Sequence, residues 1–504
     1  MTKYVDFSGK PFHFIGIGGI GMSALAYILA KRKLPVSGSD IRFSHITEKL
    51  ASIGVQIFSQ QEATNLEIFP DQSDLACEAL PAAIVGANST EVHKKPGQLL
   101  GKSLANKQKA LPQVICSTAI NRANLEYRAA LDLGCPIFHR SDVLSALIQE
   151  YNSIAVAGTH GKTTTSSMIG YLLLQAGLDP TIIVGGELKA WDGNARLGKS
   201  EYLVAEADES DGSLVKLAAQ IGVITNIELD HPDHYKNLEQ VVATFKVFAQ
   251  QCKTLVACID CATVRDRLNP TISYSLNPES GADYTLTDVE YNANGTTATV
   301  WERNKQLGRL NLQQLGQHNL SNAIAAVAVG RLLNLEFSVI ANSIATFAGA
   351  RRRYELRGEV NGIGFIDDYA HHPSEIQATL AAARLQATQN RIVAIFQPHR
   401  YSRTITFLSQ FAQSFNHADL VIISDIYSAG EPDLGQINGE KLTQMIANYN
   451  PQVTYRPTLA SISEFLVQTL RPGDTALFLG AGNLNQIIPE VMTSIGGRGV
   501  RGEG

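Results

Sequence analysis

Apolar and polar positions alternate along the chain in a repeated pattern of short apolar strands and longer amphipathic helices. An apolar run at 12–16 meets a glycine-rich turn, a helix follows at about 22–33, and a second strand ends at Asp40. The same order returns at 153–157, where a strand runs into a second glycine turn and a helix over 163–175. A strand, a turn and a helix in this order are typical of a βαβ unit.

A third unit of this kind follows a small, basic stretch at 347–353, with strands expected at 364–367, 392–396, 420–424 and 475–479. Alternating strands and helices favour parallel sheets covered by helices, so we predict an α/β protein. Domains are expected at 1–150, 151–346 and 347–491, followed by a disordered tail at 492–504. The pattern weakens at about 70–112, which we interpret as an insertion in the first domain.

Length and composition agree with a multidomain globular protein. The 504 residues exceed what one hydrophobic core usually holds, and 44% hydrophobic residues are too many for a disordered chain. A net charge of −5 gives no basic field for nucleic acid. No apolar run reaches the roughly 18 residues of a membrane span. Because the six cysteines are scattered, we expect a cytoplasmic protein with small-molecule partners, no nucleic acid and no membrane insertion.

The first glycine turn, Gly16-Ile-Gly-Gly-Ile-Gly21, follows a strand and opens a helix. Glycines at 16, 18, 19 and 21 let the backbone approach a diphosphate, and the helix N-terminus offers it unpaired N–H groups. Asp40 lies about twenty residues further on, at the end of the next strand. By itself the motif leaves open a dinucleotide, a sugar nucleotide or a purely structural turn.

The second glycine turn, Gly158-Thr-His-Gly-Lys-Thr-Thr-Thr165, predicts ATP binding. Backbone N–H groups and Lys162 can hold the β and γ phosphates, while Thr163 binds Mg²⁺. The spacing is shorter than the Walker motif, because Val156 stands where its first glycine would be. The residues assigned to ATP from this turn are Gly158, Thr159, His160, Gly161, Lys162, Thr163 and Thr164.

Acidic side chains follow two further apolar strands of the central unit. One group spans 206–211, and the other spans 226–231 and ends at His231. Carboxylate oxygens suit Mg²⁺, and a histidine at a strand end can complete the site, although spacing leaves open which acid is the ligand. Further on, Asn319 and Asn322 share one face of an alanine-rich helix, where they either pair with a purine or serve as ordinary caps.

In the third unit, two polar segments each follow an apolar strand. They are Asp367-Asp-Tyr-Ala-His-His-Pro373 and Gln397-Pro-His-Arg-Tyr-Ser-Arg403. Paired acids, histidines and two arginines three apart fit the recognition of carboxylates and phosphates. The arginines at 351–353 either reach phosphate, which we favour, or belong to a solvated linker.

Taken together, these segments resemble the Mur ligases over about residues 11–487, apart from the stretch at 70–112. The resemblance implies an N-terminal Rossmann-like domain that holds a UDP group and a central P-loop ATPase-like domain with a mainly parallel sheet. It also implies a C-terminal Rossmann-like domain that closes over the site. This replaces the dinucleotide interpretation of the first glycine turn.

The resemblance also assigns roles to individual residues. Catalysis is assigned to Lys162, Glu206, His231, His371, Arg400 and Arg403. Mg²⁺ is assigned to Thr163, Glu206 and His231, and ATP is assigned, beyond the glycine turn, to His318, Asn319, Asn322, Arg353 and Asp368. The UDP substrate is assigned to Gly16, Gly18, Gly19, Gly21, Ser39, Asp40 and Ser117, and the amino acid to Tyr369 and His371.

The opening glycine motif and the segment 369–373 are most similar to the alanine-adding members. This implies ATP-dependent joining of L-alanine to the lactyl carboxylate of UDP-N-acetylmuramate through an acyl phosphate, in peptidoglycan biosynthesis, by a monomer or weak homodimer. One alternative is a sister muramyl-peptide ligase with another amino substrate. Another is an NAD-linked oxidoreductase built on the first glycine turn, which leaves the loop at 158 unexplained.

Overall fold

The computed structural model describes residues 4–67, 111–387 and 390–499. The predicted insertion at 70–112 therefore lies, except for its last two positions, outside the described residues. The chain forms two compact units, Met1–Val143 and Leu144–Gly504. None of the helices in the described part of the chain has the length and hydrophobicity that a bilayer crossing requires.

The first unit is built on a five-stranded sheet whose neighbouring strands all run parallel. The order is β3-β2-β1-β4-β5, with β1 (Phe12–Ile15), β2 (Val36–Ser39), β3 (Gln56–Phe58), β4 (Gln113–Cys116) and β5 (Ile137–His139). The helices are α1 (Ile20–Lys31), α2 (His45–Ser52) and α3 (Leu125–Asp132), with α4 (Arg140–Glu150) at the unit boundary. The strand order reverses between β1 and β4, and ligands of open α/β sheets bind at such a switch point.

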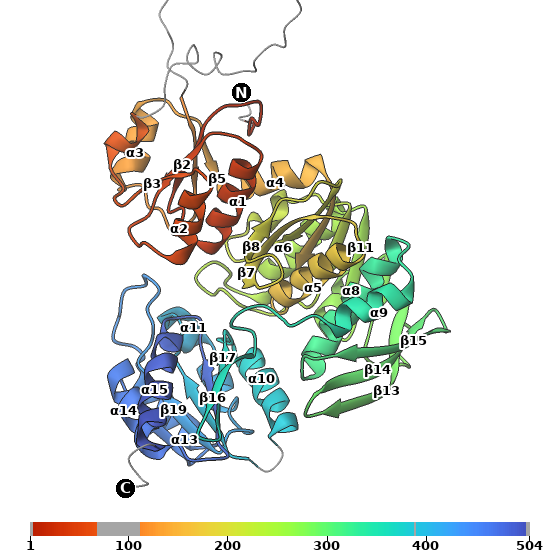
Figure 1. The fold of residues 1–504 in the computed structure, drawn as a ribbon, viewed down its shortest axis with the longest axis vertical. Coiled ribbons are helices and arrows are strands. Elements are labelled where there is room, and N and C mark those ends of the chain that lie inside the picture. Colours follow the sequence, from red (N-terminus) through yellow and green to blue (C-terminus); the bar gives the residue numbers. More distant parts are fainter. Residues whose placement is uncertain (1–3, 68–110, 388–389, 500–504) are drawn as a thin grey trace, which may run out of the picture. The chain divides into compact units, whose positions relative to one another are not determined.

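The second unit contains a ten-stranded sheet in the order β15-β14-β13-β12-β11-β10-β6-β9-β7-β8. Its strands are β6 (Asn152–Ala157), β7 (Thr181–Leu188), β8 (Gly193–Arg196), β9 (Tyr202–Glu206), β10 (Ile221–Ile224), β11 (Thr254–Cys258), β12 (Ile272–Tyr274), β13 (Tyr284–Asn292), β14 (Gly295–Glu302) and β15 (Lys305–Leu312). The strands from β7 through β9, β6, β10, β11 and β12 to β13 run parallel to one another. At the two edges, β8 pairs antiparallel with β7, and β14 and β15 form an antiparallel extension of β13 (Figure 1).

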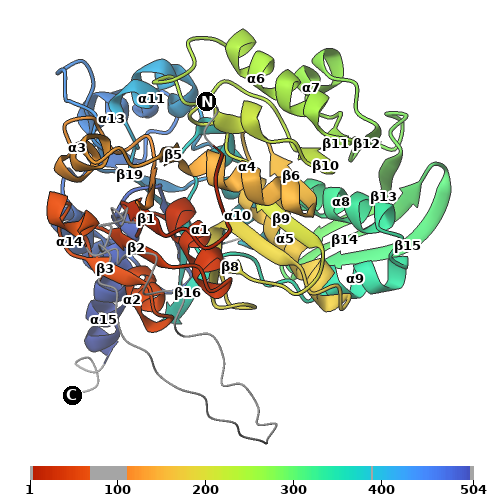
Figure 2. The same cartoon turned by 90° about the horizontal axis from the view of Figure 1, so that it is seen from above.

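Helices α5 (Lys162–Gln175), α8 (Gln317–Leu332) and α9 (Phe337–Ala345) pack on one another and on this sheet (Figure 2). The interior of α8 is rich in buried alanine, including Ala323, Ala325, Ala326 and Ala328. Small side chains let helix and sheet approach closely, which explains how a helix without a polar stripe fits here. The other helices between β6 and β15 are α6 (Leu238–Gln251) and α7 (Ala262–Arg267).

The C-terminal part of the second unit has a six-stranded sheet in the order β16-β17-β21-β18-β19-β20. The strands are β16 (Glu355–Val360), β17 (Ile363–Asp368), β18 (Ile392–Phe396), β19 (Leu420–Ile423), β20 (Val453–Tyr455) and β21 (Thr475–Leu479). The helices are α10 (Pro373–Gln386), α11 (Tyr401–Thr406), α12 (Leu408–Ala412), α13 (Gly439–Ala447), α14 (Leu459–Thr469) and α15 (Ile488–Gly499). Separate apolar cores lie on the two faces of the sheet, as expected for a doubly covered parallel sheet.

The predicted fold class, three mainly parallel α/β sheets, is confirmed. Two details differ from the sequence-based expectation. The antiparallel strands β13 to β15 were not predicted, and α15 continues to Gly499 instead of giving way to a disordered tail at 492. The helix persists because Val491 and Ile495 are buried in the apolar core of the C-terminal sheet, and this burial offsets the poor helix propensity of the glycines.

We expect Phe396→Ala to lower the free energy of unfolding by about 3–5 kcal/mol, the usual cost of removing a buried phenyl ring. Phe396 is fully buried, and its ring lies 5.5 Å from that of Phe411 and 5.6 Å from that of Phe415. Urea unfolding followed by circular dichroism measures the change. Leu356→Ala is the control, because that side chain is 67% exposed, and its expected effect is below about 0.5 kcal/mol. Equal effects of the two substitutions would contradict this account of the core.

Candidate functional site

The loop at 158–161 joins β6 to α5 and depends on two glycines. Gly158 has a φ of 141°, and a Cβ there would lie 1.9 Å from the Thr225 hydroxyl oxygen. Gly161 has a φ of 82°, and a Cβ there would lie 2.6 Å from the side-chain oxygen of Asn322. No side chain caps the N-terminus of α5. Its first N–H groups are therefore available to an anion such as phosphate.

Lys162, the first residue of α5, is held inside the site. Its Nζ lies 2.8 Å from the carbonyl oxygen of Gly158 and 2.9 Å from both carboxylate oxygens of Glu209. Burial opposes the charge on Lys162, but the nearby charges of Glu209, Asp208 and Glu206 outweigh burial and raise its pKa. The ammonium group therefore remains charged and points along the phosphate loop.

Acidic side chains gather where β9 ends. The Glu206 carboxylate accepts a 2.8 Å hydrogen bond from the N–H of Gly185, and a Cβ on Gly185 would lie 2.5 Å from that carboxylate. Glu209 is buried, which raises its pKa to about 7 although Lys162 opposes the shift. One Glu209 oxygen, Oε2, lacks a hydrogen bond with suitable geometry. The cation that this oxygen faces in the structure is Lys162 Nζ, 2.9 Å away.

The loop after β10 brings His231 to the same place. Strands β9 and β10 are the two neighbours of β6, so Glu206, His231 and the phosphate loop lie at the carboxyl ends of adjacent parallel strands. His231 Nε2 lies 3.9 Å from Glu209 Oε1. Burial lowers the pKa of His231, so its imidazole is neutral near pH 7 and has a lone pair for a metal.

Thr163, Glu206 and His231 offer the kinds of donor that suit the divalent cation predicted from the sequence. Thr163 is the second residue of α5, directly after Lys162. A Cβ on Gly186 would lie 2.9 Å from the Thr163 methyl carbon, and its neighbour Gly185 faces Glu206, so both side chains approach consecutive glycines of β7. Oxygen donors with an excess of negative charge are the ligands that Mg²⁺ prefers.

The C-terminal sheet contributes residues to the phosphate loop. The Arg353 guanidinium lies 3.3 Å from the Thr163 hydroxyl and stacks over the Tyr369 ring, at 5.0 Å from its centre. Asp368 ends β17 and accepts hydrogen bonds from the backbone N–H groups of Tyr354 and Ala370, each at 2.7 Å. Burial raises the pKa of Asp368 to about 6, against the charge of Arg353. The predicted residues Arg353, Asp368 and Tyr369 are thus brought together beside Thr163.

His371, which follows this group in the chain, is partly buried. Its Nδ1 lies 2.9 Å from the carbonyl oxygen of Tyr369 and 3.2 Å from Glu375. Burial lowers the pKa of His371 to about 4. The neutral ring therefore keeps its proton on Nδ1, which faces the carbonyl, and carries its lone pair on Nε2.

Arg400 and Arg403 both reach the loop that carries His231. Arg400 makes a 2.6 Å ion pair with Asp233, and Arg403 makes a 2.9 Å ion pair with Asp230. Arg400 is partly exposed, whereas Arg403 is only 2% exposed. In this arrangement the Arg403 guanidinium is directed at Asp230 rather than at open space.

His160 of the phosphate loop has partners that the sequence pattern did not reveal. Its Nδ1 lies 3.3 Å from Glu375 Oε1 and its Nε2 lies 3.5 Å from Glu228 Oε2. The Ser374 hydroxyl donates a 2.7 Å hydrogen bond to the same Glu228 oxygen. Burial lowers the pKa of His160, but the two carboxylates outweigh burial and raise it to about 10. Glu375 is the third residue of α10 and belongs to the capping box of that helix. This capping position was the only feature of the sequence that could have drawn attention to Glu375.

His160, Glu228 and His372 also place three possible metal-ligand atoms within 4.8 Å of one another. Each ring nitrogen of His160 faces a carboxylate oxygen, at 3.3 Å and 3.5 Å, and this geometry fits an ion pair. Nδ1 of His372 accepts a 3.3 Å hydrogen bond from the N–H of Ser374. We therefore interpret this group as a link between the phosphate loop and α10.

The predicted adenine residues are buried at the start of α8. The Asn322 side-chain oxygen accepts a hydrogen bond from the Thr165 hydroxyl at 3.0 Å, and the Asn319 amide donates to the Leu315 carbonyl at 2.9 Å. Burial lowers the pKa of His318 to about 4. Neither asparagine caps α8, whose N-cap residue is Gly316 without a side-chain cap, so both the capping and the adenine interpretations of these residues stay predictions.

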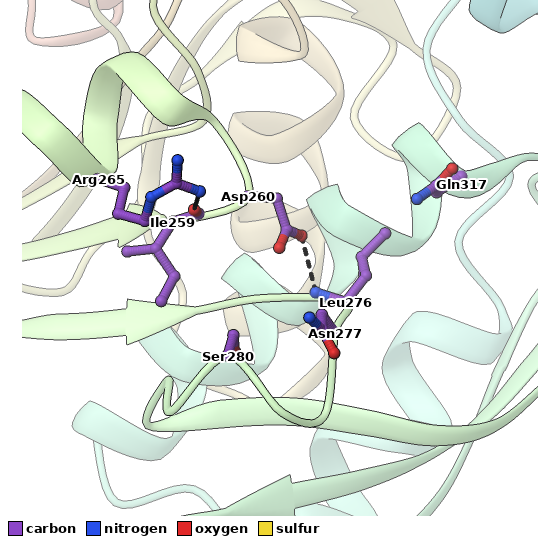
Figure 3. Close-up of a pocket in the computed structure, with 7 residues that line it drawn as sticks. All are labelled: Ile259, Asp260, Arg265, Leu276, Asn277, Ser280 and Gln317. Carbon is purple, nitrogen blue, oxygen red and sulfur yellow. Dashed lines mark hydrogen bonds between the residues drawn. The ribbon is translucent and has the colours of Figure 1, made fainter.

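A cavity of about 510 Å³ opens beside this helix start. Asp260 and Asn277 lie on loops after β11 and β12, and Gln317 is the first residue of α8 (Figure 3). The Asp260 carboxylate accepts a 2.8 Å hydrogen bond from the N–H of Leu276, which fixes the two loops together. The other lining residues are Ile259, Arg265 and Ser280.

The first glycine turn, in the first unit, lies at the switch point of its sheet. The N–H groups of Gly16 and Ile17 donate to the Ser39 carbonyl, and the N–H of Gly18 donates to Asp40 at 2.8 Å. Asp40 therefore shapes the turn through its carboxylate. Gly19 precedes α1 without a side-chain cap, which leaves that helix end available to a diphosphate.

Ser117 and Ser39 occupy different surroundings in this unit. Ser117 begins the loop after β4, on the other side of the switch point, and is partly exposed. Ser39 is fully buried, and its hydroxyl donates to Glu126. Glu126 also contacts His13 at 2.7 Å and Asn65 at 2.8 Å, all inside the protein. Ser39 thus belongs to a buried polar network that supports the turn.

Together, the fold and these contacts define a phosphate-binding α/β protein whose C-terminal sheet adds arginines and histidines to a phosphate loop. Three family models match the chain. "Mur ligase family, catalytic domain" matches residues 11–152, "Mur ligase middle domain" matches 156–330, and "Mur ligase, glutamate ligase domain" matches 352–482.

Similar proteins agree with these matches. A UDP-N-acetylmuramate–L-alanine ligase of Nostoc punctiforme is 68% identical over 495 residues, covering 98% of both chains. Another from Gloeothece citriformis is 61% identical, covering 98% of this chain and 99% of its own. The solved UDP-N-acetylmuramate-alanine ligase of Thermotoga maritima matches with a TM-score of 0.74 and 24% identity, over 97% of this chain and 99% of that one. The chain therefore belongs to the Mur ligase family.

We expect the stabilising effect of His160 to depend on pH, because its pKa is raised from 6.5 to about 10 while that of Glu228 is lowered from 4.5 to about 2. The ion pairs of His160 stabilise the folded protein fully below pH 6.5, and this stabilisation is lost as the pH rises to about 10. The contribution of Glu228 to the stability of the folded protein is fully present above pH 4.5, and it is lost as the pH falls to about 2. The melting temperature of the wild type should thus exceed that of His160→Gln most between pH 4.5 and 6.5.

Thermal unfolding of both proteins across this pH range measures the effect. His417→Gln, at an exposed histidine of the C-terminal part, is the control and should show no such maximum. A His160→Gln difference that stays constant from pH 5 to about pH 10 would show that His160 is not held as an imidazolium ion.

Proposed function

We propose that the protein joins L-alanine to the lactyl carboxylate of UDP-N-acetylmuramate, with conversion of ATP to ADP and phosphate, in cytoplasmic peptidoglycan biosynthesis. The observation that carries the proposal is the contact of Thr163, next to Lys162 in the phosphate loop, with Arg353 of the C-terminal part, which also stacks on Tyr369. Relatives more than 60% identical over nearly the whole chain are named for this reaction, which supports the choice of substrates.

The first step transfers phosphate to the substrate carboxylate. A carboxylate oxygen of UDP-N-acetylmuramate attacks the γ-phosphorus of ATP, the bond to the bridging oxygen breaks, and ADP leaves. Lys162 is placed to balance charge on the transferred group, since its Nζ lies along the loop that cradles the phosphates. Free N–H groups at the start of α5 and the Arg353 guanidinium add to this stabilisation.

Thr163, Glu206 and His231 are the residues that would hold Mg²⁺. When bound, the ion neutralises phosphate charge and orients the γ-phosphate for attack. Glu206 is kept in place by the Gly185 N–H, so its carboxylate is oriented before a ligand arrives. Lys162 would then exchange its contacts with Glu209 for contacts with phosphate oxygens.

The second step forms the amide bond. The amine of L-alanine attacks the acyl carbon, phosphate leaves with the oxygen that came from the carboxylate, and a proton leaves the nitrogen. His371 can accept that proton or a hydrogen bond, because its neutral ring carries a lone pair on Nε2. Tyr369 lies against His371 with its ring 5.3 Å away, and we place the methyl group of alanine beside these two rings.

The UDP group would bind at the switch point of the first sheet. The N-terminus of α1 faces the glycine turn that Asp40 holds in shape, which suits a diphosphate. Ser117 begins the loop on the other side of the same point. A dinucleotide site would use the same turn, but it would leave the phosphate loop at 158 without a role.

We expect phosphate release from Mg²⁺-ATP to require both UDP-N-acetylmuramate and L-alanine. The measurement is a phosphate assay with L-alanine, D-glutamate or a muramyl tripeptide in separate reactions. Release with another amine alone would assign the protein to a sister ligase. Turnover of NAD without phosphate release would support the oxidoreductase alternative instead.

Lys162→Ala should lower kcat by about 100-fold or more, because removal of one donor to developing charge commonly has this effect. Lys305→Ala, at an exposed lysine of β15, removes the same charge far from the loop and should leave kcat unchanged. Steady-state kinetics of the two variants beside the wild type makes the comparison. Similar kcat values for Lys162→Ala and the wild type would contradict the assigned role of Lys162.

A further inference from the structure

Arg403 is the largest side chain among the fully buried residues that the structure describes. It lies on α11 of the C-terminal part, yet its Nε donates a 2.9 Å hydrogen bond to Asp230, which belongs to the loop after β10 of the central sheet. Asp230 is only 4% exposed. A buried arginine costs desolvation energy unless its charge is paired, so this pair is a defined contact between the two parts.

Asp230 connects this arginine to His231. The same oxygen, Asp230 Oδ1, accepts the hydrogen bond from Arg403 and a 2.7 Å hydrogen bond from the N–H of His231. His231 has a φ of 52°, a left-handed conformation that is uncommon for a residue with a side chain. The backbone needs such support to remain in this conformation, and the support sets the direction of the imidazole.

We propose that Arg403 is a positioning residue: through Asp230 it holds His231 ready to bind the divalent cation, so that docking of the C-terminal part completes the metal site. The inference rests on the proposed function, because it assumes that His231 is a metal ligand. The cation would then be held fully only when the C-terminal part is docked on the loop after β10 of the central sheet.

Two features separate Arg403 from a residue that binds substrate directly. Its guanidinium is buried, with Nε on Asp230 and one terminal nitrogen 3.3 Å from Nδ1 of His399. Arg400, three positions earlier, pairs with Asp233 at 2.6 Å and is partly exposed, so it remains accessible to a ligand. Exposed ion pairs contribute little to structure, whereas a buried pair fixes geometry.

The test uses Mn²⁺ as a probe for the divalent cation. Electron paramagnetic resonance measures free Mn²⁺ during titration of the full-length protein with ADP present. Asp230→Asn and Arg403→Lys should each weaken Mn²⁺ binding about tenfold, the usual effect of losing support behind a metal ligand. His231→Gln should weaken it at least as much. Glu187→Gln removes a different contact of the two parts, the 2.8 Å pair with Arg351, and should leave Mn²⁺ binding unchanged.

A folded Asp230→Asn protein that binds Mn²⁺ within about twofold of the wild type overturns the proposal. This variant decides the question if Arg403→Lys does not fold, which circular dichroism establishes. Equal losses in Asp230→Asn and Glu187→Gln also overturn it, because they would show a general effect of docking. Unchanged binding in His231→Gln overturns the metal assignment itself. The phosphate assay on the wild type is independent of these results, so the ligase function is judged separately.

Discussion

The ion pair of the partly buried Lys162 with Glu209 is the interaction on which the rest of the site depends. The ammonium group is surrounded by Glu206, Asp208 and Glu209 at the end of β9, and these charges keep it protonated despite burial. Adjacent parallel strands bring this cluster, the phosphate loop and His231 to one edge of the sheet. Carboxylates in such number are stable here only with cations beside them. The same requirement prepares the site for Mg²⁺ and for phosphate groups.

Contacts with the C-terminal part complete this arrangement. Arg353 reaches the Thr163 hydroxyl, His160 lies between carboxylates of both parts, and Arg403 supports Asp230. Each contact joins the phosphate loop, the start of α5 or the loop that carries His231 to a residue of the C-terminal part. We infer that phosphate activation and amide formation require the same docked arrangement.

The sequence predicted the fold class because strand and helix periodicity alternates clearly, and it located the phosphate loop because glycine, lysine and hydroxyl residues have fixed roles there. It did not predict the antiparallel strands β13 to β15, whose pattern does not distinguish them from parallel strands. It also did not reveal that His160 pairs with Glu228 and Glu375, or that Arg403 pairs with Asp230. Such partners are far apart in the chain, and only the folded backbone brings their charges together. The assignments of substrates to individual residues remain predictions.

The central claim is that this site activates a carboxylate with ATP before an amine attacks it. The most direct measurement uses UDP-N-acetylmuramate whose lactyl carboxylate carries ¹⁸O, with ATP and L-alanine, and analyses the released phosphate by mass spectrometry. An acyl phosphate intermediate predicts that each phosphate released carries one labelled oxygen, with the other retained in the amide. Phosphate that contains no label would show that ATP is hydrolysed by water, and would contradict the account.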